Sequence, residues 1–459
     1  MVRLFKVFIP LGTLLLLVSE IVLVAGAFAL AAFWMLPDAA IFLTGDGIYS
    51  IGLIVVTMVI GLYLQDLYTD IQVKSKVLLV QQLCFVMGVA FLLEALVSYV
   101  NRNLRMPLHV MLPGGAMVLV FVFTWRLTFS TYALRIMGAE RLLLVGGSPL
   151  LEKIAAHIAE TPANGLQVIG FLDHEVAADS PGGKYLGSIE SLREVVAATH
   201  PARIVVGMLE RRNRLPVADL LDLRFSGNVV EEAATAYERI CGRVPIRELR
   251  PSQLIYSSDS VQLHRALLYH NVTNFLVAVF GLIVASPFIL LTALAVRLTS
   301  RGPVLYRQVR VGMGGRPFTL YKFRSMRTDA EANTGAVWAS RDDPRATPVG
   351  RVIRRIRFDE LPQLFNVLKG EMSIVGPRPE RPEFVKTLVG QIPFYRQRQA
   401  VRPGITGWAQ INYKYGDTLE DTIVKLEYDL YYIKHLSFSL DVYIIFHTLK
   451  AMLLSRGAQ

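Results

Sequence analysis

The sequence predicts a membrane protein of three parts: an α-helical membrane region, a central α/β module, and a C-terminal α+β domain with a re-entrant membrane helix. Three observations predict this fold class. Long apolar runs fill the first 125 residues, strand and helix patterns alternate in the middle, and the last third is rich in charge, Gly and Pro. We expect boundaries at residues 1–135, 136–262, 263–300 and 301–459.

The composition supports this division. Hydrophobic residues make up 53%, charged residues 19%, and the mean hydropathy is +0.42, whereas soluble domains carry about 25% charged residues. These values exclude a disordered chain, a coiled coil and a simple cytosolic enzyme. The formal charge of +11 indicates an anionic partner, such as lipid headgroups, nucleotide phosphates or nucleic acid. Two distant cysteines, Cys84 and Cys241, exclude a disulfide scaffold.

Four apolar runs lie at residues 7–36, 48–65, 77–100 and 108–125. Each is long enough to cross a hydrocarbon core of about 30 Å. The first is too long for a signal peptide, so we interpret it as a signal anchor. With the N-terminus inside, the loops on the inner side carry most of the basic residues: Arg3, Lys6, Lys74, Lys76, Arg126, Arg135 and Arg141. This bias predicts four spans that return the chain to the cytoplasm.

Strand patterns at 141–147, 168–173 and 202–209, with an amphipathic segment at 189–198, predict a small parallel sheet of Rossmann type. The segment that follows the first strand, Gly146 to Leu151, lacks the later glycines of a dinucleotide fingerprint. We therefore expect a structural or regulatory module, with nucleotide binding as the alternative.

A fifth apolar run covers residues 274–296. A true span would place the next segment outside, yet no acid occurs between 281 and 328 and that segment is strongly basic, which is typical of the cytoplasmic side. Ser286 and Pro287 lie inside the run, where proline removes a helix hydrogen bond and serine can satisfy the freed carbonyl. These features predict a helix-break-helix that enters and leaves by one leaflet; a kinked fifth span is the alternative.

Asp359 and Glu360 form an adjacent pair of carboxylates just before Pro362. Proline suits the first turn of a helix, so we expect both acids at or near a helix N-terminus. The helix dipole and Arg351, Arg354, Arg355 and Arg357 would keep a carboxylate ionised there. Such a group can bind Mg²⁺ or attack phosphorus as a nucleophile. The alternative is an ordinary solvated helix start.

Two rigid loops carry arginines. Pro377 and Pro379 hold Arg378 in a stiff segment suited to recognising phosphate, and Arg402 precedes Pro403 in a second such loop. The Gly312 to Arg316 segment lacks the Lys-Ser/Thr of a phosphate-binding loop, so we expect a hairpin turn there. No Tyr-x-x-x-Lys, zinc spacing or nucleophile elbow is present in the sequence.

The motifs of the last third carry a family resemblance. YKFRSM (321–326), DELPQLFN (359–366), KGEMS (369–373), VGPRPE (375–380), PGITGWAQIN (403–412) and KLEYDLYYIK (425–434) occur in order. Together they resemble the bacterial sugar transferases, the monotopic phosphoglycosyl transferases, over about residues 270–459. Four spans and a central module resemble the long-form members, and the C-terminal wording resembles the branch associated with exosortases.

The resemblance implies transfer of a sugar 1-phosphate from a UDP-sugar to undecaprenyl phosphate, with release of UMP. Asp359 matches the family nucleophile, and Glu360 matches its partner at a Mg²⁺ site. Ser286 and Pro287 match the break of the re-entrant helix. We expect further residues to bind substrate: Lys322, Arg324, Arg357, Pro377, Arg378, Pro379 and Arg402. One departure is that His270, Asn271 and Asn274 stand where the family often has Lys, Arg and Asp, which puts the usual headgroup anchoring in doubt.

The resemblance and the charge bias together imply a multi-pass protein of the bacterial inner membrane, with its catalytic domain on the cytoplasmic face. Its expected partners are a UDP-sugar, undecaprenyl phosphate, membrane lipids and, in a homodimer, a second copy; nucleic acid is not expected. Two other hypotheses are a membrane-anchored nucleotide-sugar dehydratase or epimerase, and a non-enzymatic scaffold for polysaccharide assembly. The sequence does not identify the sugar.

Overall fold

The computed structural model describes residues 2–4, 7–9, 11–68, 73, 75–101, 105–133, 139–161, 165–173, 183–208, 215–249, 260–327, 345–413 and 418–453. The basic residues Lys6, Lys74 and Arg135, on which part of the expected orientation depends, lie outside these ranges. Apart from the first few residues, the chain forms two compact units that divide between Ala233 and Ala234.

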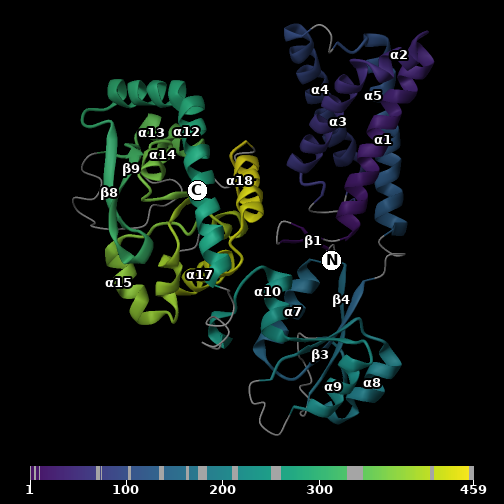
Figure 1. Cartoon of the computed structure of the whole chain (residues 1–459), viewed down its shortest axis with the longest axis vertical. Helices are drawn as coiled ribbons and strands as arrows, with labels where there is room; N and C mark the ends of the chain where they lie inside the picture. The colour runs from purple at the N-terminus through teal and green to yellow at the C-terminus, as the bar shows by residue number, and fades with distance from the viewer. Residues whose placement is uncertain are drawn as a thin grey trace. The chain divides into compact units, whose positions relative to one another are not determined.

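The four N-terminal apolar runs form helices, as predicted (Figure 1). They are α1 (Leu11–Met35), α3 (Gly47–Leu64), α4 (Lys76–Val100) and α5 (Leu108–Thr128). Short elements accompany them: β1 (Val2–Leu4), β2 (Val7–Ile9), α2 (Ala39–Thr44) and a π-helical turn η2 (Phe129–Ala133). Together with a later helix, five helices within the described ranges are long and apolar enough to cross a membrane. They indicate a multi-pass membrane protein.

An ion pair joins the first and last helices of this region. Arg126 in α5 lies 2.7 Å from Glu20 in α1, and both side chains are buried. The Tyr68 hydroxyl donates a hydrogen bond to the same carboxylate at 2.6 Å. Arg126, which the sequence placed on a cytoplasmic flank, lies in the last turn of α5 and takes part in the helix packing. Charges inside such a region are tolerated where they pair with one another.

The central module contains a parallel five-stranded sheet in the order β5-β4-β3-β6-β7. The predicted strands correspond to β3 (Glu140–Val145), β4 (Leu166–Leu172) and β6 (Arg203–Val206), whereas β5 (Tyr185–Gly187) and β7 (Val229–Glu232) were not predicted. Both missed strands are short and half-buried, so they lack the continuous apolar run that marks a buried parallel strand.

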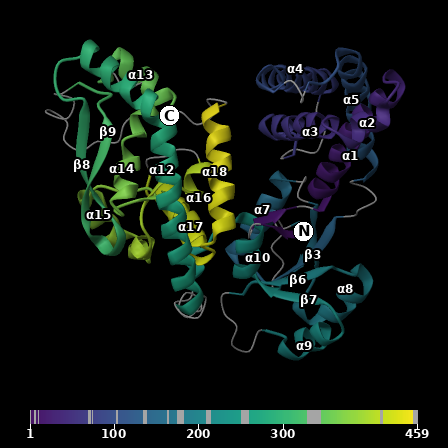
Figure 2. The same ribbon diagram turned by 45° about the horizontal axis from the view of Figure 1, so that its top comes forward.

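Helices cover both faces of this sheet. Figure 1 shows α7 (Pro149–Glu160) on one side and α8 (Leu192–Thr199) with α9 (Val217–Phe225) on the other, and Figure 2 shows β3, β6 and β7 side by side. A short helical turn, η4 (Ile189–Ser191), leads into α8. The arrangement confirms the expected central α/β module with a parallel sheet.

The second unit begins with α10 (Ala233–Cys241) and η5 (Ile246–Glu248). This segment, which the expected boundary assigned to the central module, packs on the C-terminal helices. The Trp408 indole donates to the Gly242 carbonyl at 2.8 Å, and the Lys434 ammonium lies 2.8 Å from Glu238. Because these bonds link residues far apart in sequence, no local pattern indicates them.

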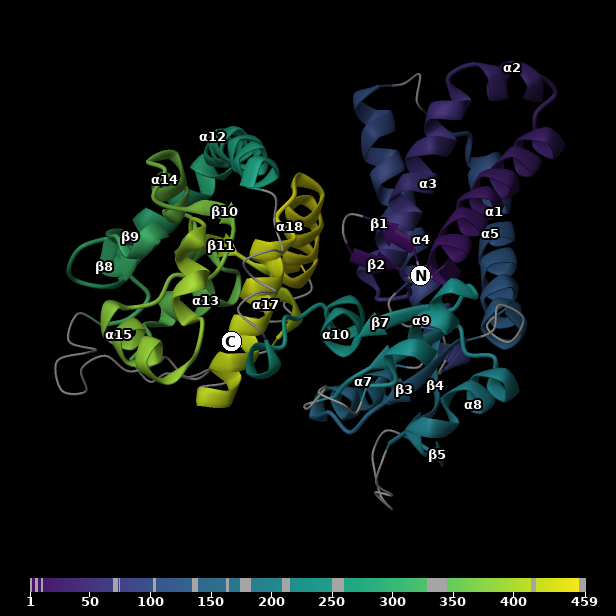
Figure 3. The ribbon, with the colours of Figure 1, turned by 60° about the horizontal axis from the view of Figure 1, so that its bottom comes forward.

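The described strands of this unit form one hairpin and one small parallel pair, and helices make up its other elements (Figure 3). Strands β8 (Leu305–Val311) and β9 (Pro317–Phe323) pair antiparallel around the turn η6 (Met313–Gly315), which confirms the predicted hairpin. Strands β10 (Ser373–Val375) and β11 (Gly404–Thr406) pair in parallel. The helices are α13 (Pro348–Arg355), η7 (Phe358–Glu360), α14 (Gln363–Leu368), α15 (Pro382–Gln391), η8 (Tyr395–Ala400), α16 (Trp408–Asn412), α17 (Leu419–Lys434) and α18 (Phe438–Leu453).

The fifth apolar run lies in one long helix, α12 (Ser260–Thr299), which stays helical through Pro287. Figure 1 draws this helix as two limbs that meet at a clear angle. Proline at 287 cannot donate to the carbonyl of Ile283, and the Ser286 hydroxyl donates to that carbonyl instead, at 2.8 Å. The serine and proline therefore make the contacts that the sequence predicted, whereas the backbone stays helical through both residues.

Candidate active site

The two adjacent acids lie in a short helical turn that directly precedes a helix. Asp359 and Glu360 belong to η7, and Pro362 is the N-cap residue of α14. Both acidic side chains are buried. The structure thus agrees with the predicted position near a helix N-terminus, but it excludes the solvated helix start that was the alternative.

Three cations approach Glu360. The Lys322 ammonium lies 2.7 Å from Oε1, the Arg378 guanidinium 3.3 Å from the same oxygen, and the Arg357 guanidinium 3.9 Å from Oε2. Burial raises the pKa of this carboxyl, but the charges of Lys322, Arg378 and Arg357 outweigh that effect, so its pKa lies well below the ordinary value. Glu360 therefore stays ionised, and it gathers cations from three separate segments.

Asp359 has a different environment. Its Oδ1 is buried and has no hydrogen-bond partner among the residues that the structure describes. Burial is the main reason that its pKa is raised, to about 6, and the nearby charge of Glu360 adds to the increase, although Lys322 opposes it. The basic residues therefore keep Glu360 ionised, whereas Asp359 holds a carboxylate oxygen that is desolvated and available to a ligand or a reacting atom.

The backbone turns sharply just before this pair. Arg357 has a φ of 62° and a ψ of 19°, in the left-handed region. Such a conformation is uncommon for a residue other than Gly, Asn or Asp, and backbone strain of this kind is concentrated at functional sites. Arg357 thereby caps the turn η7 and directs its own guanidinium towards Glu360.

The loop with two prolines brings Arg378 to the pair from another direction. Pro377 and Pro379 fix the backbone on both sides of Arg378. The Arg398 guanidinium donates to the Arg378 carbonyl at 3.0 Å and pairs with Asp429 at 2.9 Å. A hollow beside this loop is lined by residues of the hairpin, the loop and η8, including Gly312, Arg378, Arg398, Gln399 and Pro403.

Two of the predicted substrate-binding residues make other contacts. Arg324 is buried, and its guanidinium donates to the carbonyls of Ser300 and Arg301 just after α12, at 2.8 and 2.9 Å. Arg402 donates to the side chain of Asn271 in α12 at 2.9 Å. The structure therefore gathers Lys322, Arg357 and Arg378 around the two acids, whereas it places Arg324 and Arg402 against the membrane helix.

The part of α12 around Pro287 lies close to the acidic pair. Phe288, directly after Pro287, packs edge-on against Phe358, with ring centroids 5.5 Å apart. Farther along the helix, Ala278 belongs to a cluster with Leu320 of the hairpin and Val367 of α14. The helix, the hairpin and the turn with the two acids thus form one packed body.

Sequence reasoning missed two supporting networks. Asn366 is fully buried, and its side chain bonds the Tyr321 amide at 3.1 Å and the Thr319 carbonyl at 2.7 Å, which fixes the hairpin beside α14. Arg398 and Asp429 hold the Arg378 loop, as described above. Asn366 and Asp429 lie within the motifs that carry the resemblance. A polar residue without an assigned role in such a motif could have indicated each network.

The site suits a magnesium ion by the chemistry of its donors. Asp359 Oδ1 is a buried carboxylate oxygen without a protein partner among the described residues, and Glu360 Oε2 has the Arg357 guanidinium at 3.9 Å. No group of three His, Cys, Asp or Glu side chains that could hold a metal occurs in the part of the chain that the structure describes. Mg²⁺ often binds one or two carboxylates together with substrate phosphates, so two acids are sufficient.

Comparisons with known proteins agree with the motifs. The model of the family described as "Bacterial sugar transferase" matches residues 265–455. UDP-glucose:undecaprenyl-phosphate glucose-1-phosphate transferase of Xanthomonas campestris pv. campestris is 34% identical over 352 residues, which cover 72% of this chain and 70% of that protein. The chain belongs to the bacterial sugar transferase family.

Two further sugar transferases of known name match over smaller shares of their length. A UDP-N-acetylgalactosamine-undecaprenyl-phosphate N-acetylgalactosaminephosphotransferase of Aeromonas hydrophila is 46% identical over 225 residues, 48% of this chain and 52% of that protein. An undecaprenyl-phosphate glucose phosphotransferase of Komagataeibacter xylinus is 34% identical over 327 residues, 70% of this chain and 60% of that protein. This member of the family therefore spans only half to three fifths of these two relatives.

Proposed function

We propose that this protein transfers a sugar 1-phosphate from a UDP-sugar to undecaprenyl phosphate, releasing UMP, as the first membrane step of exopolysaccharide or O-antigen synthesis. The observation that carries the proposal is the buried Asp359–Glu360 pair, with an Asp359 oxygen that no described residue bonds, beside three cations. The names of the relatives support the donor and acceptor classes. The wording of residues 407–437 supports placing the chain in the exosortase-associated branch.

The reaction has two displacements at one phosphorus atom. A carboxylate oxygen of Asp359 attacks the phosphorus that carries the sugar; the bond from this phosphorus to the bridging oxygen breaks, and UMP leaves with that oxygen. A phosphate oxygen of undecaprenyl phosphate then attacks the same phosphorus, and the Asp359 carboxylate is released. A covalent intermediate allows a water-soluble donor and a lipid acceptor to use one site in turn.

The other residues position the donor and balance its charge. Glu360 stays ionised and holds Lys322 and Arg378 at the phosphate position. Both cations, with Arg357, then face the diphosphate, where fixed positive groups stabilise the charge of the transferring phosphoryl group. We assign the uridine to the hollow beside Pro377–Arg378–Pro379, which Arg378 also lines.

Asp359 and Glu360 would hold the magnesium ion. When bound, Mg²⁺ neutralises phosphate charge and favours departure of the leaving group. The requirement for Mg²⁺ and the choice among UDP-sugars are tested together by measuring UMP release over a panel of UDP-sugars with undecaprenyl phosphate, with and without the metal. UMP release beyond one equivalent per protein that needs one UDP-sugar, the lipid phosphate and Mg²⁺ supports the proposal. A lack of release with every sugar, from protein that is folded, would favour the scaffold hypothesis.

For the membrane arrangement, we propose that α12 enters and leaves by the cytoplasmic leaflet, so that the catalytic unit and the central module share the cytoplasmic side of the inner membrane. Single cysteines at three exposed positions test this in a background without Cys84 and Cys241: Ala40→Cys after α1, Ala198→Cys in α8, and Lys386→Cys in α15. We expect A198C and K386C to react on one side with an impermeant maleimide, and A40C on the other. Labelling of K386C together with A40C would mean that α12 is a true fifth span.

A further inference from the structure

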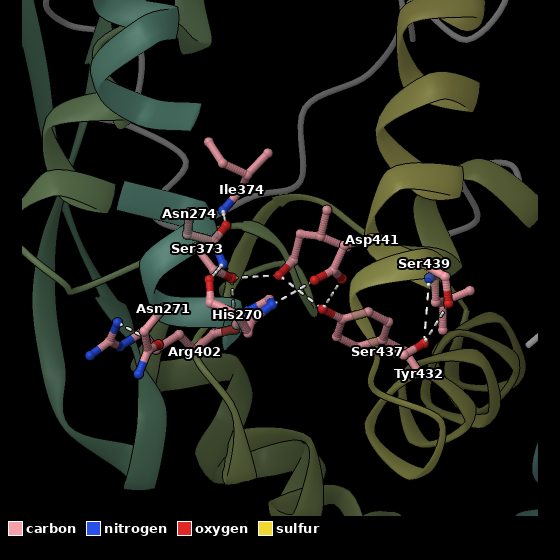
Figure 4. Close-up of polar contacts among 12 residues, drawn as sticks. His270, Asn271, Asn274, Ser373, Ile374, Arg402, Tyr432, Ser437, Ser439 and Asp441 are labelled. Atoms are coloured by element: carbon pink, nitrogen blue, oxygen red, sulfur yellow. Dashed lines mark hydrogen bonds and ion pairs between the residues drawn. The ribbon is translucent and has the colours of Figure 1, made fainter. Parts of the chain in front are cut away.

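The N-terminal limb of α12 makes a set of side-chain bonds to strand β10 and to the C-terminal helices (Figure 4). The Asn274 side-chain oxygen accepts a hydrogen bond from the Ile374 amide at 2.6 Å, and its amide nitrogen donates to the His270 carbonyl at 2.5 Å. Both Asn274 and His270 are buried. His270, Asn271 and Asn274 thus bond within the protein, at the positions where the family often carries charged residues.

The bond to Asn274 lies at the edge of strand β10 that faces away from β11. In the parallel pair of β10 and β11, the Ser373 amide donates to the Pro403 carbonyl on the β11 side. Because successive amides of a strand point in opposite directions, the Ile374 amide faces away from β11. Asn274 supplies the acceptor at this free edge, so α12 takes the place of a third strand at one point.

A second set of polar contacts, made by α17 and α18, holds the same region. His270 Nδ1 lies 2.7 Å from Asp441 Oδ2 in α18, and the Tyr432 hydroxyl donates to Asp441 Oδ1 at 2.7 Å. Burial and the Asp441 carboxylate raise the pKa of Tyr432 well above its ordinary value, so the phenol keeps its proton. The Tyr432 oxygen is also 3.3 Å from the Val375 carbonyl, at the end of β10.

The chain from β10 to the active site is short and stiff. The Gly376 amide donates to the Thr406 carbonyl at 2.8 Å, and a Cβ on Gly376 would lie only 2.5 Å from the Arg402 carbonyl oxygen. The Pro377 carbonyl accepts from the Gly404 amide at 2.9 Å. Arg378 follows, with its guanidinium 3.3 Å from Glu360. A displacement of Ile374 would therefore also displace Arg378, because backbone hydrogen bonds and close packing hold the segment between them.

We propose that Asn274 is a positioning residue of the transferase. Its hydrogen bond to Ile374 fixes β10 against α12, and β10 in turn fixes the position of Arg378 beside Glu360. His270, through Asp441 and Tyr432, holds the same strand from its other end. This inference rests on the proposed function, since it assigns to Arg378 the donor phosphates. A displacement of about 1 Å at a catalytic group can lower a rate about 100-fold. Asn274 can therefore affect the rate although it does not contact the substrate.

The test compares Asn274→Leu, which removes both hydrogen bonds at similar size, with Asn274→Asp, which keeps the acceptor for the Ile374 amide but loses the donor to the His270 carbonyl. Asn228→Leu in the central module is the matched control, because Asn228 also donates to a backbone carbonyl, that of Leu223 at 3.1 Å, and has no route to Arg378. In lipid nanodiscs we expect N274L to raise the KM for the UDP-sugar about 10-fold, with the KM for the lipid acceptor within about 2-fold. N274D should regain part of the loss, because it keeps one of the two hydrogen bonds of Asn274, and N228L should resemble the wild type.

A double-mutant cycle with Arg378→Ala provides the decisive kinetic comparison. If Asn274 acts through Arg378, N274L adds little to the loss of kcat/KM already caused by R378A. Additive losses, a change confined to the acceptor KM, or an N274D variant as impaired as N274L would overturn the proposal.

Hydrogen exchange gives a readout that does not depend on activity. The amides of residues 373–381 should exchange about 10-fold faster in N274L than in the wild type, because Ile374 loses its acceptor, while N274D and N228L stay near the wild-type rate. Unchanged exchange in N274L would contradict the coupling even if the wild type showed no transferase activity. Absence of UMP release from the wild type would instead count against the proposed function alone.

Discussion

Replacing Asp359 with Asn is expected to abolish sugar-phosphate transfer while the protein stays folded. Asn cannot form an acyl phosphate by the same displacement, so UMP release should fall by at least about 1,000-fold. The substitution also removes a buried carboxylate whose pKa is raised by desolvation. Above about pH 6 the variant should therefore unfold at a temperature equal to or higher than that of the wild type, which distinguishes lost chemistry from lost structure.

The control for this variant is Glu383→Gln, an exposed acid in the first turn of α15, which should retain full activity. Elution volume in size-exclusion chromatography and the unfolding temperature confirm that both proteins are folded. Substantial Mg²⁺-dependent UMP release by D359N would rule out Asp359 as the nucleophile.

Replacing Glu360 with Gln is expected to lower the rate about 100-fold and to move its pH dependence. In the wild type, kcat/KM should rise as the pH increases through about 6, because Asp359 must lose its proton before it attacks and its pKa is raised to about 6. The negative charge of Glu360 is one cause of that increase. Its removal leaves Lys322 and the neighbouring arginines uncompensated, so the pKa of Asp359 falls and the acid limb should move down by about one pH unit.

This shift separates an electrostatic role of Glu360 from a merely structural one. Loss of the shared anion also destabilises the fold by about 1–3 kcal/mol, since the partner cations retain some solvent. A rate that falls without any movement of the acid limb would contradict the division of roles between the two acids. Glu383→Gln again serves as the reference for both the rate and the pH profile.

The helices and the sheet were predictable because their signals are local. Apolar runs long enough to span a bilayer became α1, α3, α4 and α5, and continuous apolar strands became β3, β4 and β6. The effect of Ser286 and Pro287 was also local, since both act on the carbonyl of Ile283 within the same turn.

The roles of individual charged residues were not predictable in this way. Arg324 and Arg402 lie in basic, motif-rich segments, yet their guanidinium groups bond the end of α12 and Asn271. Arg126 pairs with Glu20, which is 106 residues away. Such contacts depend on how distant elements pack, and a sequence shows only that the charge is present.

The two acids illustrate the same limit within one site. The sequence predicted that four neighbouring arginines, Arg351, Arg354, Arg355 and Arg357, keep a carboxylate ionised. The three cations within 4 Å of Glu360 are Arg357 from this set and Lys322 and Arg378 from distant segments. Asp359 is the preceding residue, but burial dominates its environment and raises its pKa. Adjacent residues of the same chemistry differ because their side chains point into different surroundings.

The acceptor-free half-reaction tests most directly whether a covalent intermediate forms on Asp359. Purified protein in nanodiscs is incubated with a UDP-sugar labelled in the sugar and with Mg²⁺, without undecaprenyl phosphate, and is then examined by peptide mass spectrometry. We expect one UMP released per protein and one sugar phosphate bound covalently to Asp359, which disappears when the lipid phosphate is added and never forms in D359N. UMP release that begins only when both substrates are present, with no adduct on Asp359, would contradict the covalent mechanism.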